Sequence, residues 1–215
     1  MNHSEKTVSY TSTNSYSTLN QLTDNTKNVW IVLHGIGYLS RYFLKYFDGL
    51  PSADNFIIAP QAPSKYYLNN QYRHVGASWL TKEETFRETE NVLNYLDAVL
   101  AKQNIPEKCK CIVFGFSQGV SIATRWVAKR KLKCTQLVLY AGGIPNELES
   151  PDFDFLTNNE TKVTVLVGDK DEYLTEDRQK EETIKIEKLF GSLAEQIIFE
   201  GGHEVKKELI NDLVK

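Results

Sequence analysis

Short apolar segments recur along the chain, and a stretch with helical character follows most of them. Continuous apolar runs of this length are typical of strands that are buried on both faces of a parallel sheet. Strands that alternate with helices form such sheets, so the pattern predicts an α/β protein with three layers. The predicted strands lie at 29–33, 56–59, 111–114, 137–140, 163–167 and 196–199.

The segments between these strands contain the predicted helices. Helical patterns cover 40–47, 120–129 and 181–190, and a terminal helix begins at about Glu204. The sequence from Thr81 to Glu84 (TKEE) has the form of a capping box, which predicts a helix start there with Glu84 at the third position. Apolar residues then fall on one helical face, namely Phe86, Leu93, Leu96 and Leu100.

Two further segments fall outside this alternation. Residues 6–19 alternate polar and β-prone side chains around Asn14 and Ser15, which predicts a hairpin of two weak strands at a sheet edge. Residues 60–78 are rich in tyrosine and predict a long loop.

Composition limits the classes of function. A chain of 215 residues without a composition break predicts one domain, 1–215. The net charge of −3, with acids and bases interspersed, argues against a nucleic-acid partner. The chain contains no run of about 18 apolar residues, so membrane insertion is not expected. The polar N-terminus lacks the apolar core of a secretory signal, and the three cysteines lack metal-ligand spacing with histidine, so a cytoplasmic protein with reduced thiols and no metal is expected.

A G-x-S-x-G pattern follows one predicted strand directly. Gly115-Phe116-Ser117-Gln118-Gly119 lies between the strand at 111–114 and the helix at 120–129. In this strand–turn–helix context, glycines on either side of the serine allow a sharp turn that exposes its hydroxyl. Ser117 is therefore the candidate nucleophile. The alternative is a serine that caps an ordinary glycine-containing turn.

A serine hydroxyl needs a base to accept its proton, and histidine suits this role because its pKa lies near neutral pH. His203 follows the last predicted strand in the sequence FEGGHE. Enzymes with this elbow place the histidine after both the serine and the acid, and His203 alone satisfies that order. His3 lies near the terminus, His74 in the long loop, and His34 in a glycine turn where a packed structural role is expected.

The third group must be a carboxylate that orients the imidazole. VTVLVGDKDEYL offers Asp169 and Asp171 after its strand. Asp169 follows the strand so closely that it could cap a turn, whereas a loop could aim Asp171 at His203, so Asp171 is preferred. Asp152 and Asp154 are more distant candidates.

Acyl transfer also requires donors for the oxyanion. In this arrangement one backbone N–H follows the nucleophile and another comes from the glycine turn after the first central strand, which here is His34-Gly35-Ile36-Gly37. The candidate donors are thus the backbone amides of Gln118 and Ile36. The alternative is that Gly35 and Gly37 only make the loop flexible.

The chain resembles the phospholipase/carboxylesterase family of α/β-hydrolases, which includes acyl-protein thioesterases. The segments that carry the resemblance are LHGIG, FIIAPQAP, GFSQG, AGGIP, GDKDEY and GGH. It implies an α/β-hydrolase fold with a mostly parallel sheet of about eight strands and no separate lid domain. It also implies that Ser117, Asp171 and His203 are catalytic and that Ile36 and Gln118 form the oxyanion hole.

The sequence departs from the family pattern at three places near these motifs. Tyr38 follows the glycine turn where relatives often have Asp, Thr81 stands where they often read W-x-D, and Val120 replaces a glycine after GFSQG. None of these changes removes a predicted catalytic residue. They do weaken any substrate assignment taken from a relative.

The expected activity is hydrolysis of small carboxylic esters or thioesters without a cofactor. Tyr66, Tyr67, Tyr72 and Trp79 could line the acyl pocket, although aromatic loop residues often pack onto their own domain. A transacylase or perhydrolase with the same triad is one alternative, and a non-catalytic binding protein is another. A homodimer is compatible with the sequence.

Overall fold

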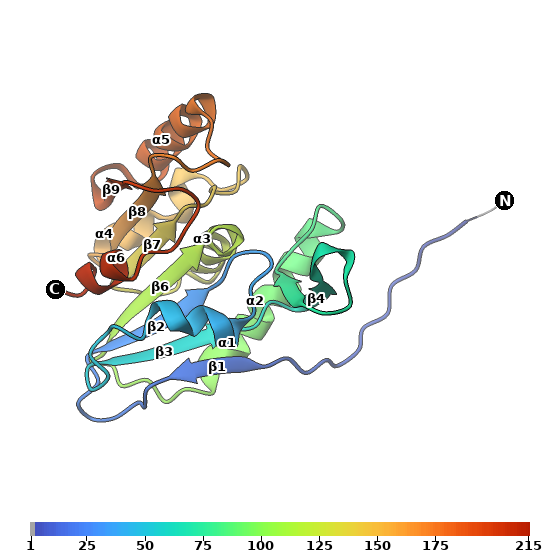
Figure 1. Ribbon diagram of the computed structural model, residues 1–215, viewed down its shortest axis with the longest axis horizontal. Helices are drawn as coiled ribbons and strands as arrows, with labels where there is room; N and C mark the ends of the chain where they lie inside the picture. Colours follow the sequence, from blue (N-terminus) through green and yellow to red (C-terminus); the bar gives the residue numbers. More distant parts are fainter. Residues whose placement is uncertain (1–2) are drawn as a thin grey trace.

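A seven-stranded sheet forms the centre of the computed structural model, which describes residues 3–215 and all of their side chains except that of Asn70. The strand order is β1-β3-β2-β6-β7-β8-β9. Only β1 at one edge is antiparallel to its neighbour, and the other pairs are parallel (Figure 1). The strands are β1 (Tyr16–Leu19), β2 (Asn28–Leu33), β3 (Asn55–Pro60), β6 (Lys110–Phe116), β7 (Gln136–Tyr140), β8 (Lys162–Gly168) and β9 (Ala194–Phe199).

Helices cover both faces of this sheet, as the sequence predicts. One face packs against α1 (Ser40–Phe43), the 3₁₀ turn η1 (Leu44–Tyr46) and α6 (Lys207–Asp212). The other packs against α2 (Thr85–Ala101), α3 (Gln118–Arg130), α4 (Asp154–Asn158) and α5 (Glu176–Phe190). Of two more 3₁₀ turns, η3 (Ser150–Asp152) precedes α4 and η4 (Gly191–Leu193) follows α5. The fold is that of an α/β three-layer sandwich.

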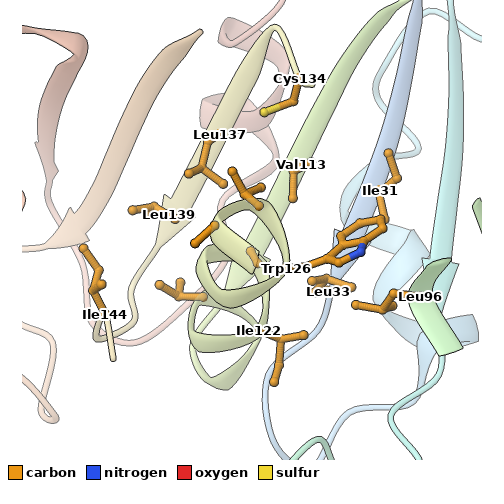
Figure 2. Close-up of a cluster of buried hydrophobic side chains, with 14 of the residues drawn as sticks. Ile31, Leu33, Leu96, Val113, Ile122, Trp126, Cys134, Leu137, Leu139 and Ile144 are labelled. Atoms are coloured by element: carbon orange, nitrogen blue, oxygen red, sulfur yellow. The ribbon is translucent and has the colours of Figure 1, made fainter. Parts of the chain in front are cut away.

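The buried strands supply both layers of the core by alternation. In β2, Val29 and Ile31 face the α2–α3 side, while Trp30 and Val32 face the α1–α6 side. Every residue of β2 is buried, which explains why residues 29–33 are continuously apolar rather than alternating. Figure 2 shows the first of these clusters around Trp126 of α3, which is 1% exposed.

The main sheet has seven strands among the described residues, close to the predicted number of about eight. One prediction about the edge of this sheet needs correction. The predicted hairpin at 6–19 is wrong, because residues 6–15 are mostly exposed and only β1 is a strand, paired with β3. A polar segment without apolar partners gains too little from burial to offset the entropy of ordering it.

The segment at 60–78 contains a β-hairpin rather than a long loop. Strands β4 (Ser64–Tyr67) and β5 (Val75–Ser78) pair antiparallel, with the 3₁₀ turn η2 (Leu68–Asn70) between them. The β-prone tyrosines suit such a ribbon. The hairpin forms a separate two-stranded sheet, which lies apart from the main sheet in Figure 1.

The predicted capping box is also absent. Helix α2 begins at Thr85, and Glu84 precedes it in a left-handed conformation with φ 48°. The Thr81 hydroxyl instead accepts the N–H of Glu83 at 3.2 Å, which closes a local turn before the helix. Side-chain hydrogen bonds of this kind compete with helix formation. Helices α5 and α6 likewise begin at Glu176 and Lys207 rather than at the predicted positions.

Candidate active site

Ser117 lies in a sharp turn between β6 and α3, at the carboxyl edge of the sheet. Its backbone has φ 52° and ψ −118°, a strained conformation for a residue with a Cβ. Its N–H donates to the carbonyl of Tyr140 at 2.9 Å, which ties the turn to β7. This strain, held by the neighbouring strand, turns the hydroxyl outward from the sheet.

The two glycines of the motif permit this turn by close backbone approach. A Cβ on Gly119 would lie 2.0 Å from the carbonyl oxygen of Leu33, and one on Gly115 would lie 2.5 Å from that of Gly119. Both distances are far inside van der Waals contact, so no side chain fits at either position. The steric reason for the motif is therefore visible in the structure.

His203 reaches Ser117 from the loop after β9. Its Nε2 lies 2.9 Å from the hydroxyl oxygen of Ser117. The imidazole ring packs between Phe116 and Tyr173, with ring centroids 5.1 and 4.7 Å away, and the side chain is 16% exposed. The ring is thus held in place but stays accessible to solvent on one side.

Asp171 completes a continuous chain of hydrogen bonds. Its Oδ2 lies 2.8 Å from Nδ1 of His203, and its side chain is fully buried. Its Oδ1 accepts the N–H of Tyr173 at 3.0 Å. A carboxylate at Nδ1 favours the tautomer that carries its proton there, which leaves Nε2 free to accept the proton of Ser117.

Asp169 has a different position, although it stands close to Asp171 in sequence. Its exposed carboxylate accepts the N–H of Gly201 at 2.8 Å, in the loop that carries His203. It makes no hydrogen bond to the imidazole itself. Asp152 and Asp154 lie in η3 and at the start of α4, and neither lines the cavity beside Ser117.

The remaining histidines lie away from Ser117. His34 is completely buried, accepts the N–H of Ala62 at Nε2 (3.2 Å) and donates from Nδ1 to the carbonyl of Gly35 (2.8 Å). Burial lowers the pKa of His34 from 6.5 to about 4, so the ring is neutral at ordinary pH. This is the packed structural role that the sequence predicts. His3 and His74 are exposed and do not line the cavity.

The two candidate oxyanion donors border the same cavity as Ser117. Ile36 lies in the turn after β2, and Gln118 is the first residue of α3, so its N–H has no acceptor within the helix. Neither N–H donates a hydrogen bond to any other group among the described residues. The Gln118 side chain is occupied elsewhere, since its Oε1 accepts the N–H of Trp79 at 2.8 Å.

The cavity itself has a volume of about 470 Å³. The sequence predicted Tyr66, Tyr67, Tyr72 and Trp79 for its wall, but none of them lines it. Trp79 is 1% exposed, and its indole N–H donates to the carbonyl of His34 at 2.7 Å, so it belongs to the core. The three tyrosines are exposed on the hairpin β4–β5 and the turn within it.

Other loops supply the wall instead. They are the segments that follow β2, β7 and β8, and they contribute Tyr38, Gly142, Gly143, Tyr173, Leu174 and Arg178. Tyr38 and the two glycines stand next to motifs that the sequence already singled out, so proximity to a strand end could have indicated them. Nothing in the sequence pattern indicated Arg178, which reaches the cavity from the first turn of α5.

Comparison with known proteins identifies the family. Residues 14–215 match the sequence model of the phospholipase/carboxylesterase family. The chain belongs to this family. Membership makes it a hydrolase with esterase activity, of the serine esterase and thioesterase type. A search of curated protein sequences finds no significant match.

Solved structures of phospholipase/carboxylesterase relatives and similar proteins share the fold. A phospholipase/carboxylesterase from Dyadobacter fermentans is 21% identical with a TM-score of 0.68, covering 96% of this chain and 99% of that one. Acyl-protein thioesterase 2 of Zea mays is 15% identical with a TM-score of 0.67, covering 93% and 96%. The Bacillus cereus carboxylesterase is 15% identical with a TM-score of 0.64, covering 93% and 91%. At such identities the likeness concerns the α/β-hydrolase fold.

Two departures from the phospholipase/carboxylesterase pattern have a visible place in the structure. Val120 is fully buried, and a Cβ on Gly142 would lie 2.6 Å from its Cγ2, so the valine fits because residue 142 is a glycine. Tyr38 lines the cavity, and its hydroxyl lies 3.2 Å from that of Tyr46. Both residues therefore pack near the elbow that contains Ser117.

Among residues 3–215, no helix is long and apolar enough to cross a membrane. Within the same residues, no three side chains of His, Cys, Asp or Glu gather as metal ligands would.

Proposed function

We propose that the protein hydrolyses carboxylic esters or thioesters through an acyl-enzyme intermediate on Ser117. The observation that carries this proposal is the chain of two hydrogen bonds, 2.9 Å from Ser117 to His203 and 2.8 Å from His203 to Asp171. The three residues come from three separate loops at the carboxyl edge of the sheet, where ligands bind in such folds. This arrangement has the geometry of a nucleophile, a general base and a carboxylate that orients the base.

In the first half of the reaction, Nε2 of His203 takes the hydroxyl proton while Oγ of Ser117 forms a bond to the substrate carbonyl carbon. The carbonyl π electrons move to its oxygen. When the tetrahedral intermediate collapses, the bond to the alcohol or thiol breaks, and His203 returns the proton to that leaving group. The buried Asp171 stabilises the transient imidazolium, which would otherwise be costly in a partly buried position.

In the second half, water replaces the alcohol. His203 takes a proton from water, the resulting hydroxide adds to the acyl carbon, and Oγ of Ser117 leaves as it regains the proton. The products are a carboxylic acid and the free enzyme. Both tetrahedral intermediates carry negative charge on oxygen, and in this proposal the N–H groups of Ile36 and Gln118 stabilise that charge. Residues of the chain and water therefore supply every group that this mechanism uses.

The proposal is tested by labelling the folded protein with a fluorophosphonate probe and mapping the modified peptide. We expect one adduct, on Ser117, because the probe reacts with activated serines. Ser117→Ala should abolish labelling and lower kcat for para-nitrophenyl butyrate by a factor on the order of 10⁶. Ser121→Ala, which changes another serine lining the cavity, is the control and should keep labelling. Labelling or turnover that survives in Ser117→Ala would refute the assignment.

A further inference from the structure

Arg178 brings a positive charge to the wall of the cavity that contains Ser117 and His203. Among the described residues that line this cavity, it is the only Lys or Arg. One of its guanidinium nitrogens donates to the carbonyl of Tyr173 at 3.1 Å. A second guanidinium nitrogen lies 3.2 Å from the point where a Cβ on Gly143 would stand. Because Gly143 has no side chain, the guanidinium has room at this position.

Nearby cations are paired with carboxylates, whereas Arg178 is not. Arg125 lies 2.6 Å from Glu147, and Lys185 lies 3.1 Å from Glu182. No carboxylate oxygen of residues 3–215 comes within 4.0 Å of the Arg178 guanidinium. Acids do stand in the adjoining groove, where Asp177 and Glu181 join Glu182, but they leave the guanidinium without a direct partner.

The position of Arg178 in its helix is unfavourable for a cation. It is in the first turn of α5, where the aligned peptide dipoles carry partial positive charge, and Glu176 and Asp177 before it follow the usual preference for acids. An arginine here gains nothing from the helix. A role toward something outside the helix explains its presence better.

We propose that the preferred substrates are esters or thioesters that carry a carboxylate, which Arg178 binds. The planar guanidinium presents parallel N–H donors that match the two oxygens of a carboxylate. The cavity also contains Asp171, but that side chain is fully buried behind His203, so its charge is already engaged. This inference rests on the proposed hydrolase function and names the substrate class of that site.

The test compares matched esters that differ in one charged group. On the acyl side, the para-nitrophenyl monoester of adipic acid is paired with para-nitrophenyl hexanoate. On the leaving-group side, meta-carboxyphenyl hexanoate is paired with meta-methylphenyl hexanoate. For each pair the readout is the ratio of kcat/KM for the charged ester to that for the neutral ester. The pair with the higher ratio tells which half of the substrate faces Arg178.

We expect the wild-type ratio to exceed one in one pair and Arg178→Gln to lower it by about 10- to 150-fold, the usual range for a hydrogen bond to a charged group. Arg178→Lys should restore part of the preference. Lys180→Gln removes the same charge from α5 outside the cavity and should leave the ratio unchanged. Added salt should weaken the wild-type preference, because screening acts on exposed charges.

The outcomes separate this inference from the hydrolase proposal. If the wild type hydrolyses the neutral esters without preferring either charged ester, the inference about Arg178 is wrong and the hydrolase function stands. The same holds if Arg178→Gln and Lys180→Gln change the ratio equally, since the effect would then be one of net charge. If no ester is hydrolysed, both proposals fail.

Discussion

Asp169 and Asp171 are separated by a single residue after β8, and the fold places them in different surroundings. The carboxylate of Asp171 is buried against His203, whereas that of Asp169 is exposed and binds the backbone of Gly201. Asp169 therefore acts on the histidine loop rather than on the imidazole. The two positions should respond very differently to the same substitution.

Asp171→Asn is expected to lower kcat on the order of 10⁴-fold, because an amide N–H facing Nδ1 favours the tautomer that cannot accept the proton of Ser117. Asp169→Asn, the matched control, should cost about tenfold or less, since an amide oxygen can still accept the N–H of Gly201. Turnover of para-nitrophenyl butyrate measures both. A collapse in Asp169→Asn alone would transfer the role of the acid to Asp169.

At the scale of elements, the elbow between β6 and α3 depends on contact with β2. Helix α3 can begin directly after Ser117 because Gly119 brings its first turn against the carbonyl of Leu33. The same contact fixes the direction in which α3 leaves the sheet. The helix and Ser117 are thus positioned by one backbone approach.

Gly119→Ala should lower the free energy of unfolding by about 2 kcal/mol or more, because a Cβ there would lie 2.0 Å from the carbonyl oxygen of Leu33 and the backbone must shift. Labelling of Ser117 should fall as well. Gly191→Ala serves as the control: its backbone, with φ 49° and ψ −129°, strains a residue with a Cβ by about 1–3 kcal/mol, but nothing lies within 4 Å of the added carbon, so labelling of Ser117 should stay normal. Urea unfolding measures the stability, and labelling that stays normal in Gly119→Ala would contradict this account of the elbow.

At the scale of the whole molecule, His34 links stability to pH. It lies at the end of β2, buried between Phe43 and Trp79, with ring centroids 6.3 and 5.1 Å away. Burial holds its folded pKa at about 4, against 6.5 for an ordinary histidine. Between these values the unfolded chain binds a proton that the folded protein does not, so stability must fall as the pH falls from about 6.5 to about 4.

The size of this effect is roughly 3 kcal/mol, from the pKa difference and the free energy of one pKa unit. His34→Gln, whose amide can replace both hydrogen bonds, should be less stable than the wild type at pH 7, and the gap should narrow toward pH 4. Denaturant unfolding across this pH range measures the difference in stability between the wild type and His34→Gln. The other titrating groups contribute equally to both proteins and cancel in this difference. A gap that does not change with pH would show that His34 is not the linked group.

The fold follows largely from the sequence because its apolar pattern has few solutions. A run such as VWIVL in β2 can be buried only with cover on both faces, and the intervening helices supply that cover. The residues at which individual helices begin were less well predicted. Thr81 has the form of a helix cap, yet its hydroxyl closes a turn, because a local hydrogen bond can satisfy either structure.

For the candidate site, the sequence alone determined the local context of Ser117, the proposed nucleophile, and the chain order of the proposed serine, acid and histidine. G-x-S-x-G has a steric meaning that is local to the chain, and the strand before it and the helix after it are evident from periodicity. Which carboxylate reaches His203, which residues line the cavity and where Arg178 points were decided only by the tertiary structure. These depend on the paths of loops that are far apart in sequence, and no short-range pattern encodes a distance between them.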